Sequence, residues 1–205
     1  MVRKYFNRIP VTVRPNFCIL LAALILMVPL KWVIAWAVAT VVHETFHYVM
    51  IRICRVPVCS LTVTAHGMRM ETAPMPYLTE FFCALAGPVG ALMLLLLARW
   101  FPEVAACAYV QSLYNLLPLY PLDGGRAVRS LLLQCLPEST ADRASRWFGF
   151  CILMAFCCLG FYASCFLKLG PVPLLAAALL FFRHMRVKIP CKDGKQRVQY
   201  SKRNE

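Results

Sequence analysis

The chain alternates between long apolar runs and short basic segments. Three stretches, 81–98, 104–122 and 147–167, carry no charged residue over 18, 19 and 21 positions. A bilayer core about 30 Å thick needs about 20 apolar residues per helix, so each of these runs is long enough to cross it. The pattern predicts an all-α polytopic membrane protein.

Shorter apolar runs extend this pattern toward both ends of the chain. Residues 17–30 and 169–182 are uncharged, and another run follows Lys31 and leads into a polar cluster. For the two short runs an interfacial or re-entrant segment is the alternative to a spanning helix. We expect about six transmembrane helices, with predicted bounds of 16–30, 32–53, 79–100, 104–120, 147–167 and 171–185.

These bounds also divide the chain into regions. We expect a basic cytoplasmic N-terminus over 1–15, a six-helix membrane domain over 16–185 and a basic cytoplasmic tail over 186–205. Each flanking region carries several Lys and Arg residues.

Charge explains the orientation of the helices. The 205 residues include 22 Lys and Arg but nine Asp and Glu, which gives a net charge of +13, and 60% of them are hydrophobic. Such an excess can indicate a nucleic-acid partner. If both termini are cytoplasmic, however, 19 basic residues lie inside and three lie outside, namely Lys31, Arg99 and Lys168. Because cytoplasmic loops are enriched in Lys and Arg, we expect a multi-pass cell-membrane protein and no nucleic acid.

The second apolar run contains ionisable residues that a spanning helix normally lacks. It reads His43-Glu44-Thr45-Phe46-His47, and on a helix the two histidines share one face. Burying such groups in a membrane is costly, so they indicate function. In the H-E-x-x-H pattern two imidazoles bind Zn²⁺ and the glutamate acts as general base. The alternative is a helix that packs satisfied polar groups.

A catalytic zinc site of this type needs a third protein ligand. Of the acidic residues, Asp123 follows a long uncharged run, whereas Glu71 and Glu80 fall in or beside an expected inner loop. Pro118 and Pro121 should end the helix before Asp123, and Gly124-Gly125 lets the backbone turn. Asp-Gly-Gly is also a common turn sequence, which is the other interpretation of this segment.

A short polar segment between the second and third helices has the period of β-structure. In 60–71 polar and apolar residues alternate on both sides of His66-Gly67. This alternation predicts a small cytoplasmic β-hairpin, with a plain loop as the alternative. An open hairpin edge could hold an unwound substrate as an added strand.

Three motifs together resemble the site-2 protease family of intramembrane zinc metalloproteases. They are His43–His47 in one helix, Ala86–Pro88 in the next, and Asn115–Gly125 two helices later. The order of helices and the short basic N-terminus are most similar to the branch of the stage IV sporulation protein FB. That branch usually carries a nucleotide-sensing CBS domain, which we do not expect here.

The resemblance implies a role for each site residue. His43, His47 and Asp123 would bind one zinc ion per chain, Glu44 would be the catalytic base, and Asn115 would position substrate or stabilise the oxyanion. It implies regulated intramembrane proteolysis of a membrane-tethered protein, such as a pro-sigma factor or the partner of an anti-sigma factor. The implied partners are that substrate, the bilayer and an inhibitory membrane protein.

Two other functions are compatible with the same residues. One is a non-proteolytic membrane scaffold that holds zinc for stability. The other is a metal-ion transporter, because intramembrane His and Asp also mark ion paths. A transporter needs polar residues along a route, and the other apolar runs carry few.

Overall fold

A computed structural model describes residues 10–64 and 67–166, together with Gly170, Ala178 and Phe181. The chain divides into two units, Met1–Leu117 and Pro118–Glu205. Among the described residues the first unit holds α1 (Pro15–Met27), α2 (Leu30–Ile53), α3 (Tyr77–Leu92), the 3₁₀ helix η2 (Met93–Leu97), α4 (Pro102–Asn115), and strands β1 (Val11–Val13), β2 (Val58–Thr64) and β3 (Gly67–Thr72). The second unit holds α5 (Asp123–Cys135) and α6 (Glu138–Cys165).

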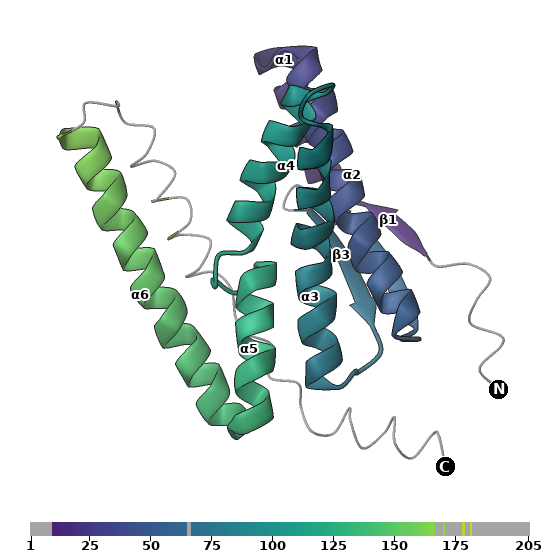
Figure 1. The fold of residues 1–205 in the computed structure, drawn as a ribbon, viewed down its shortest axis with the longest axis vertical. Coiled ribbons are helices and arrows are strands. Elements are labelled where there is room, and N and C mark those ends of the chain that lie inside the picture. The colour runs from purple at the N-terminus through teal and green to yellow at the C-terminus, as the bar shows by residue number, and fades with distance from the viewer. Residues whose placement is uncertain (1–9, 65–66, 167–169, 171–177, 179–180, 182–205) are drawn as a thin grey trace. The chain divides into compact units, whose positions relative to one another are not determined.

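Helices α2, α3 and α4 pack against one another in the first unit (Figure 1). Helices α2 and α4 run in the same direction at a constant offset. Three polar contacts join them at successive levels, namely Lys31–Glu103, Thr40–Gln111 and His43–Asn115. The offset in residue number is 72, 71 and 72 at these contacts. The two helices therefore hold one register along their whole contact.

Small residues allow α3 to lie close to α2. A Cβ atom added at Gly90 would lie 2.0 Å from Cγ of Phe46, which is far inside van der Waals contact. Ala84 and Ala91 on the same helix are fully buried. Close approach through small residues is typical of helix packing in membranes.

The polar segment between α2 and α3 forms a sheet with strand order β1-β2-β3. Strand β2 pairs antiparallel with β3, and Thr62 lies opposite Arg69. Strand β1 pairs parallel with β2 on its other side. A cluster of Ile51, Met75 and Cys83 anchors the sheet to α2 and α3. The hairpin predicted over 60–71 is confirmed, whereas the third strand, β1, lies in the segment predicted as a basic N-terminus.

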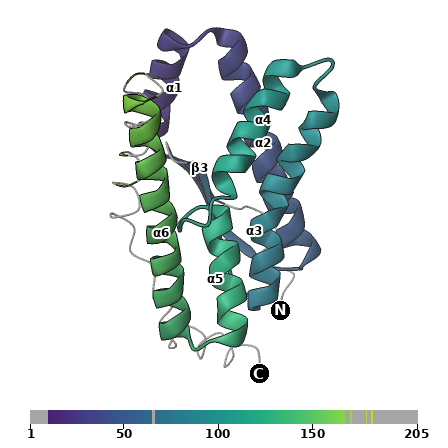
Figure 2. The same cartoon turned by 60° about the vertical axis from the view of Figure 1, so that its left-hand side comes forward.

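In the second unit α5 and α6 lie side by side (Figure 2). Arg129 of α5 is buried and donates from Nε to Oδ1 of Asp142 on α6 over 2.7 Å. Glu138 also lies 3.8 Å from the same guanidinium. A buried charge is tolerated when it is paired and hydrogen-bonded, so this ion pair fixes the contact between the two helices.

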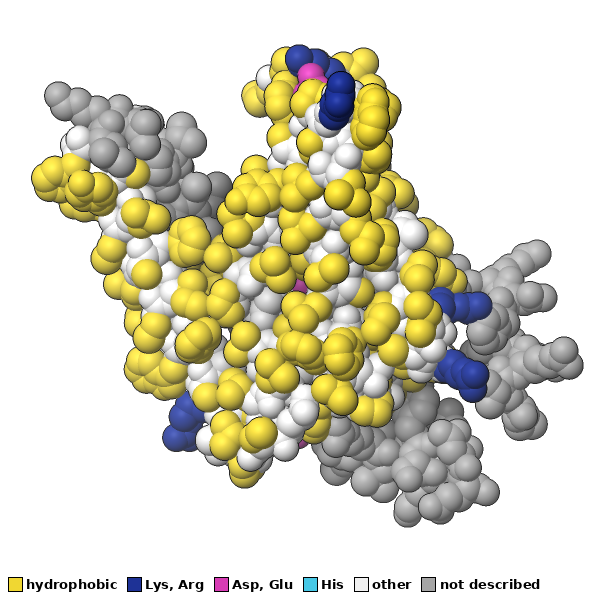
Figure 3. All heavy atoms as spheres, in the orientation of Figure 1, with side chains coloured by type: hydrophobic (Ala, Val, Ile, Leu, Met, Phe, Trp, Pro, Cys, Tyr) yellow, Lys and Arg dark blue, Asp and Glu magenta, His cyan; other side chains and the backbone are white. Residues whose placement is uncertain are grey.

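Three described helices are long and apolar enough to cross a membrane, namely α2, the continuous α3–η2 segment Tyr77–Leu97, and α6. They carry exposed apolar side chains, including Val41, Leu96 and Phe161. Apolar side chains cover much of the face seen in Figure 3. Helix α1 is apolar but shorter, at 13 residues. The predicted helix 171–185, apart from Ala178 and Phe181, lies outside the described residues, as do the tail 186–205 and His66.

The bounds of two predicted helices are wrong, and one observed helix was not predicted. Helix α4 ends at Asn115 rather than at 120, because Pro118 and Pro121 follow it and cannot donate to a helix. Helix α6 begins at Glu138, two turns before the expected position 147, since a helix can continue into polar residues beyond an apolar run. Residues 123–135 form helix α5, which is not among the six predicted helices.

Candidate metal centre

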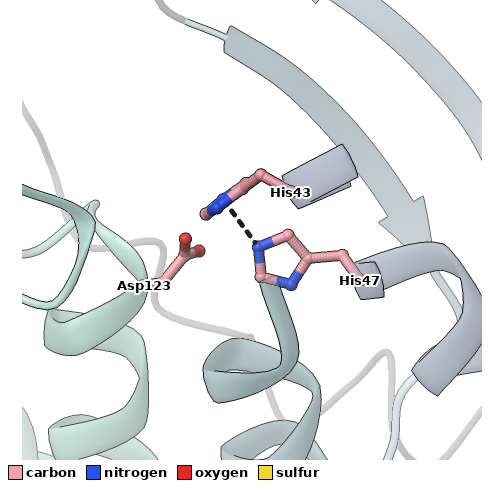
Figure 4. A group of neighbouring side chains, drawn as sticks. All are labelled: His43, His47 and Asp123. Carbon is pink, nitrogen blue, oxygen red and sulfur yellow. Dashed lines mark hydrogen bonds between the residues drawn. The ribbon is translucent and has the colours of Figure 1, made fainter. Parts of the chain in front are cut away.

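Helix α2 carries the H-E-x-x-H motif in its second half. His43 and His47 are both buried, at 3% and 8% exposure. Their Nε2 atoms lie 3.1 Å apart (Figure 4). A tetrahedral zinc ion with Zn–N bonds of about 2.0–2.1 Å separates its ligand nitrogens by about 3.3 Å. The helix therefore holds two imidazoles at nearly the spacing that zinc requires.

The backbone of α3 sets the protonation of His47. Nδ1 of His47 lies 2.7 Å from the carbonyl oxygen of Cys83. Because a carbonyl accepts hydrogen bonds and cannot donate one, Nδ1 carries the proton and Nε2 keeps its lone pair. Histidines that bind metals are usually oriented in this way by an acceptor on the other ring nitrogen. The contact leaves Nε2 of His47 in the state needed for a metal.

Gly87 leaves room for the His47 ring. A Cβ atom at this position would lie 2.2 Å from Nε2 of His47 and 2.6 Å or less from two ring carbons. Gly87 belongs to the Ala86–Pro88 motif, whose role the sequence alone did not reveal. Its close approach to an imidazole explains why this residue is glycine.

Asn115 ends α4 beside His43. Its side-chain amide Nδ2 lies 3.4 Å from Nε2 of His43. Nε2 of His43 therefore lies within hydrogen-bond distance of both Nε2 of His47 and the Asn115 amide. Imidazole nitrogens are common zinc ligands, so the two histidines fit a metal ion.

Glu44 lies beside the sheet. Its Oε1 accepts a hydrogen bond of 3.4 Å from the backbone N–H of Met68, at the start of β3. Gly67 precedes Met68 and has a φ of 113°, a conformation that favours glycine. The structure thus brings the carboxylate of the motif to the outer edge of a terminal strand, which the sequence did not predict.

Asp123 is the first residue of α5 in the second unit. Its carboxylate lies 4.0 Å from the guanidinium of Arg126, one turn along the same helix. Its side chain is 13% exposed. A carboxylate in the first turn of a helix is favoured by the helix dipole.

Four of the five predicted site residues, His43, Glu44, His47 and Asn115, belong to the first unit. His43 lies within hydrogen-bond distance of both His47 and Asn115, and Glu44 follows His43 on α2. Asp123 belongs to the second unit.

No family model and no curated protein matches the sequence. Among solved structures the fold is similar to one described as a site-2 protease from Methanocaldococcus jannaschii, with a TM-score of 0.63. The chain has the fold of a site-2 protease. The two chains are 18% identical, and the match covers 89% of this chain and 93% of the other. The site-2 protease fold thus agrees with the resemblance seen in the three sequence motifs.

Proposed function

We propose that this protein is an intramembrane zinc metalloprotease. The observation that carries the proposal is the pair His43 and His47, which face each other at 3.1 Å within a helix long and apolar enough to cross a membrane. The site-2 protease fold supports it. Zinc, when bound, lowers the pKa of water and polarises the scissile carbonyl.

Asp123 is the third zinc ligand in this proposal. Its place in the Asn115–Gly125 motif, which resembles that of the site-2 protease family, supports the assignment. Three protein ligands leave a fourth position for water, as a catalytic zinc requires.

In this proposal the other residues of the site have separate roles in hydrolysis. Glu44 takes a proton from the attacking water and passes it to the leaving amine. Asn115 points a donor at the same centre and is suited to hold the carbonyl oxygen as it gains negative charge. His47 keeps its orientation through the Cys83 carbonyl.

Metal analysis tests the ligand set. Purified protein should contain about one zinc ion per chain, and His43→Ala, His47→Ala and Asp123→Ala should each lose most of it, because every variant removes one of three ligands. Glu71→Ala is the matched control, since Glu71 pairs with Ser60 on the sheet. Full zinc in Asp123→Ala together with loss in Glu71→Ala would show that the third ligand is wrong.

We further propose that the substrate is a membrane-tethered protein cleaved near the cytoplasmic end of its membrane segment. His43 lies nine residues before Arg52, or about 13 Å along the helix. A site at this depth is suited to a single membrane helix that unwinds, and cleavage there would release a cytosolic fragment. A membrane-held transcription factor, such as a pro-sigma factor or the partner of an anti-sigma factor, fits this description. Capture of proteins by the Glu44→Gln form, followed by mass spectrometry, would identify it.

Strand β3 is suited to hold the unwound substrate. It is a terminal strand, and its Met68 N–H points toward Glu44 rather than toward β2. Alternate residues of a strand share this orientation, so the N–H of Met70 faces the same edge. A peptide added there would lie with its backbone beside the general base.

Proline at position 70 tests this edge. Met70→Pro removes one outward N–H and should slow cleavage about tenfold while zinc stays bound, because edge strands tolerate proline. Met70 also packs against the cluster of Ile51, Met75 and Cys83, so Met70→Ala controls for lost packing. A substrate whose helix-breaking residues are replaced by Leu should likewise be cut more slowly. Equal cleavage by the proline and alanine variants would contradict strand addition.

The orientation in the membrane is also a proposal. We propose six spans with both termini cytoplasmic, from the 19 basic residues on one side against three on the other. Reporter fusions at residue 205 and near Lys168 should report opposite sides of the membrane. A tail on the outer side would mean that an odd number of segments spans.

The two rival functions make different predictions. A zinc scaffold would keep its cellular role when Glu44 is neutralised, and no uncleaved protein would accumulate. A transporter would move metal ions across vesicles that contain the purified protein.

A further inference from the structure

A second polar contact joins α2 and α4 one turn from the metal centre. Thr40 donates from Oγ1 to its own helix, at the Trp36 carbonyl over 2.9 Å, and lies 3.4 Å from Oε1 of Gln111. Gln111 is four residues before Asn115 on α4, so both amides lie on the face that meets α2. Both side chains are partly buried and keep some accessible surface.

An amide within an apolar helix is costly to bury, so Gln111 needs a partner or a function. The contact with Thr40 is long, at 3.4 Å, and uses the side-chain carbonyl oxygen of Gln111. A side-chain amide offers donors as well as an acceptor, which matches the polar groups of a peptide backbone.

The spacing of the two amides matches an extended chain. Residues four apart on a helix are separated by about 6 Å along its axis. Alternate residues of an extended peptide, whose backbone groups face the same side, are about 6.6 Å apart. Gln111 and Asn115 can therefore pair with two backbone groups on one edge of the same strand.

We propose that Gln111 is a substrate-positioning residue, which with Asn115 forms a two-amide ladder for the backbone of the unwound membrane segment. The inference rests on the proposed function and adds a subsite to it. Gln111 binds a backbone group two residues from the one that Asn115 binds. It contacts only the peptide backbone, so it favours unwound segments of any side-chain composition.

Binding to an inactive form tests the ladder separately from hydrolysis. The protein is the full chain with Glu44→Gln, in phosphatidylcholine vesicles. The probe is a fluorescent Leu/Ala membrane peptide of about 25 residues with one central Asn-Gly-Pro break. Adding Gln111→Met, which keeps the size of the side chain and removes the amide, should weaken binding about tenfold with zinc unchanged.

Thr40→Val distinguishes the ladder from a bond that only joins the helices. Thr40→Val breaks the same interhelical contact but leaves the Gln111 amide in place, so it should change affinity less than about twofold. Peptides with single backbone esters give a second readout. An ester at the position paired with Gln111 should weaken binding of the peptide to the Glu44→Gln protein. With this ester peptide, adding Gln111→Met should weaken binding no further.

The outcomes separate the two hypotheses. Equal weakening by Gln111→Met and Thr40→Val, or no effect of Gln111→Met, would overturn the ladder. The peptide could bind in a Gln111-dependent way while the unmodified protein cuts no membrane protein. That result would support the ladder as a binding site and contradict the proposed protease activity.

Discussion

Replacing Glu44 by glutamine should reduce cleavage of the captured membrane protein by about 10³-fold while leaving zinc in place. The amide keeps the shape of the side chain but cannot accept a proton from water, and general acid–base catalysis contributes about 10²–10⁴-fold to enzyme rates. Glutamine can still accept the hydrogen bond of the Met68 N–H, so the contact with β3 survives. The measurement is cleavage of the captured substrate in vesicles, with zinc determined on the same sample.

Glu71→Gln is the matched control for this experiment. Glu71 is the other glutamate of this region, and its Oε2 accepts a hydrogen bond of 2.8 Å from Ser60. Its neutralisation should leave the rate within about twofold, because surface polar contacts contribute little. Near-normal cleavage by Glu44→Gln would remove the general-base role.

The histidine pair of the candidate metal centre could be predicted from sequence because it is a local pattern. Residues four apart on a helix are neighbours, so His43 and His47 had to share a face once α2 formed. The apolar residues on both sides of the motif predicted a long helix. The hairpin was predictable for the same reason, since alternation over 60–71 is a local signal.

The supporting contacts could not be predicted, because they join segments far apart in the chain. The Cys83 carbonyl, the space left by Gly87 and the Met68 N–H depend on how α3 and the sheet pack against α2. The Ala86–Pro88 motif was the one signal of this packing in the sequence.

Helix α5 was missed because its signal is amphipathic rather than apolar. Ala127, Ser130 and Leu133 are buried at intervals of three, while charged residues fall among them. A search for uncharged runs discards such a segment. Arg129 is buried as well, and only the pairing with Asp142 on α6 explains it.

The fit between Gly87 and His47 leads to the last prediction. Gly87→Ala should weaken zinc binding about 10–100-fold and reduce cleavage in proportion. The new Cβ would lie 2.2 Å from Nε2 of His47, so the ring must move away. Movement breaks the 2.7 Å contact with the Cys83 carbonyl, and loss of such an orienting partner typically costs 10–100-fold in metal affinity. Competition with a zinc chelator measures the affinity directly.

Gly90→Ala is the control that separates a displaced ligand from a loosened helix contact. Its Cβ would meet the Phe46 ring at 2.0 Å, one turn further along the same interface, and its three nearest atoms all belong to that ring. Both substitutions should lower thermal stability, because overpacking typically costs about 1–3 kcal/mol. Only Gly87→Ala should lower zinc affinity strongly at a temperature where both variants are folded. If both lost zinc equally, the close packing of α2 and α3 as a whole, and not the space left for one imidazole, would maintain the centre.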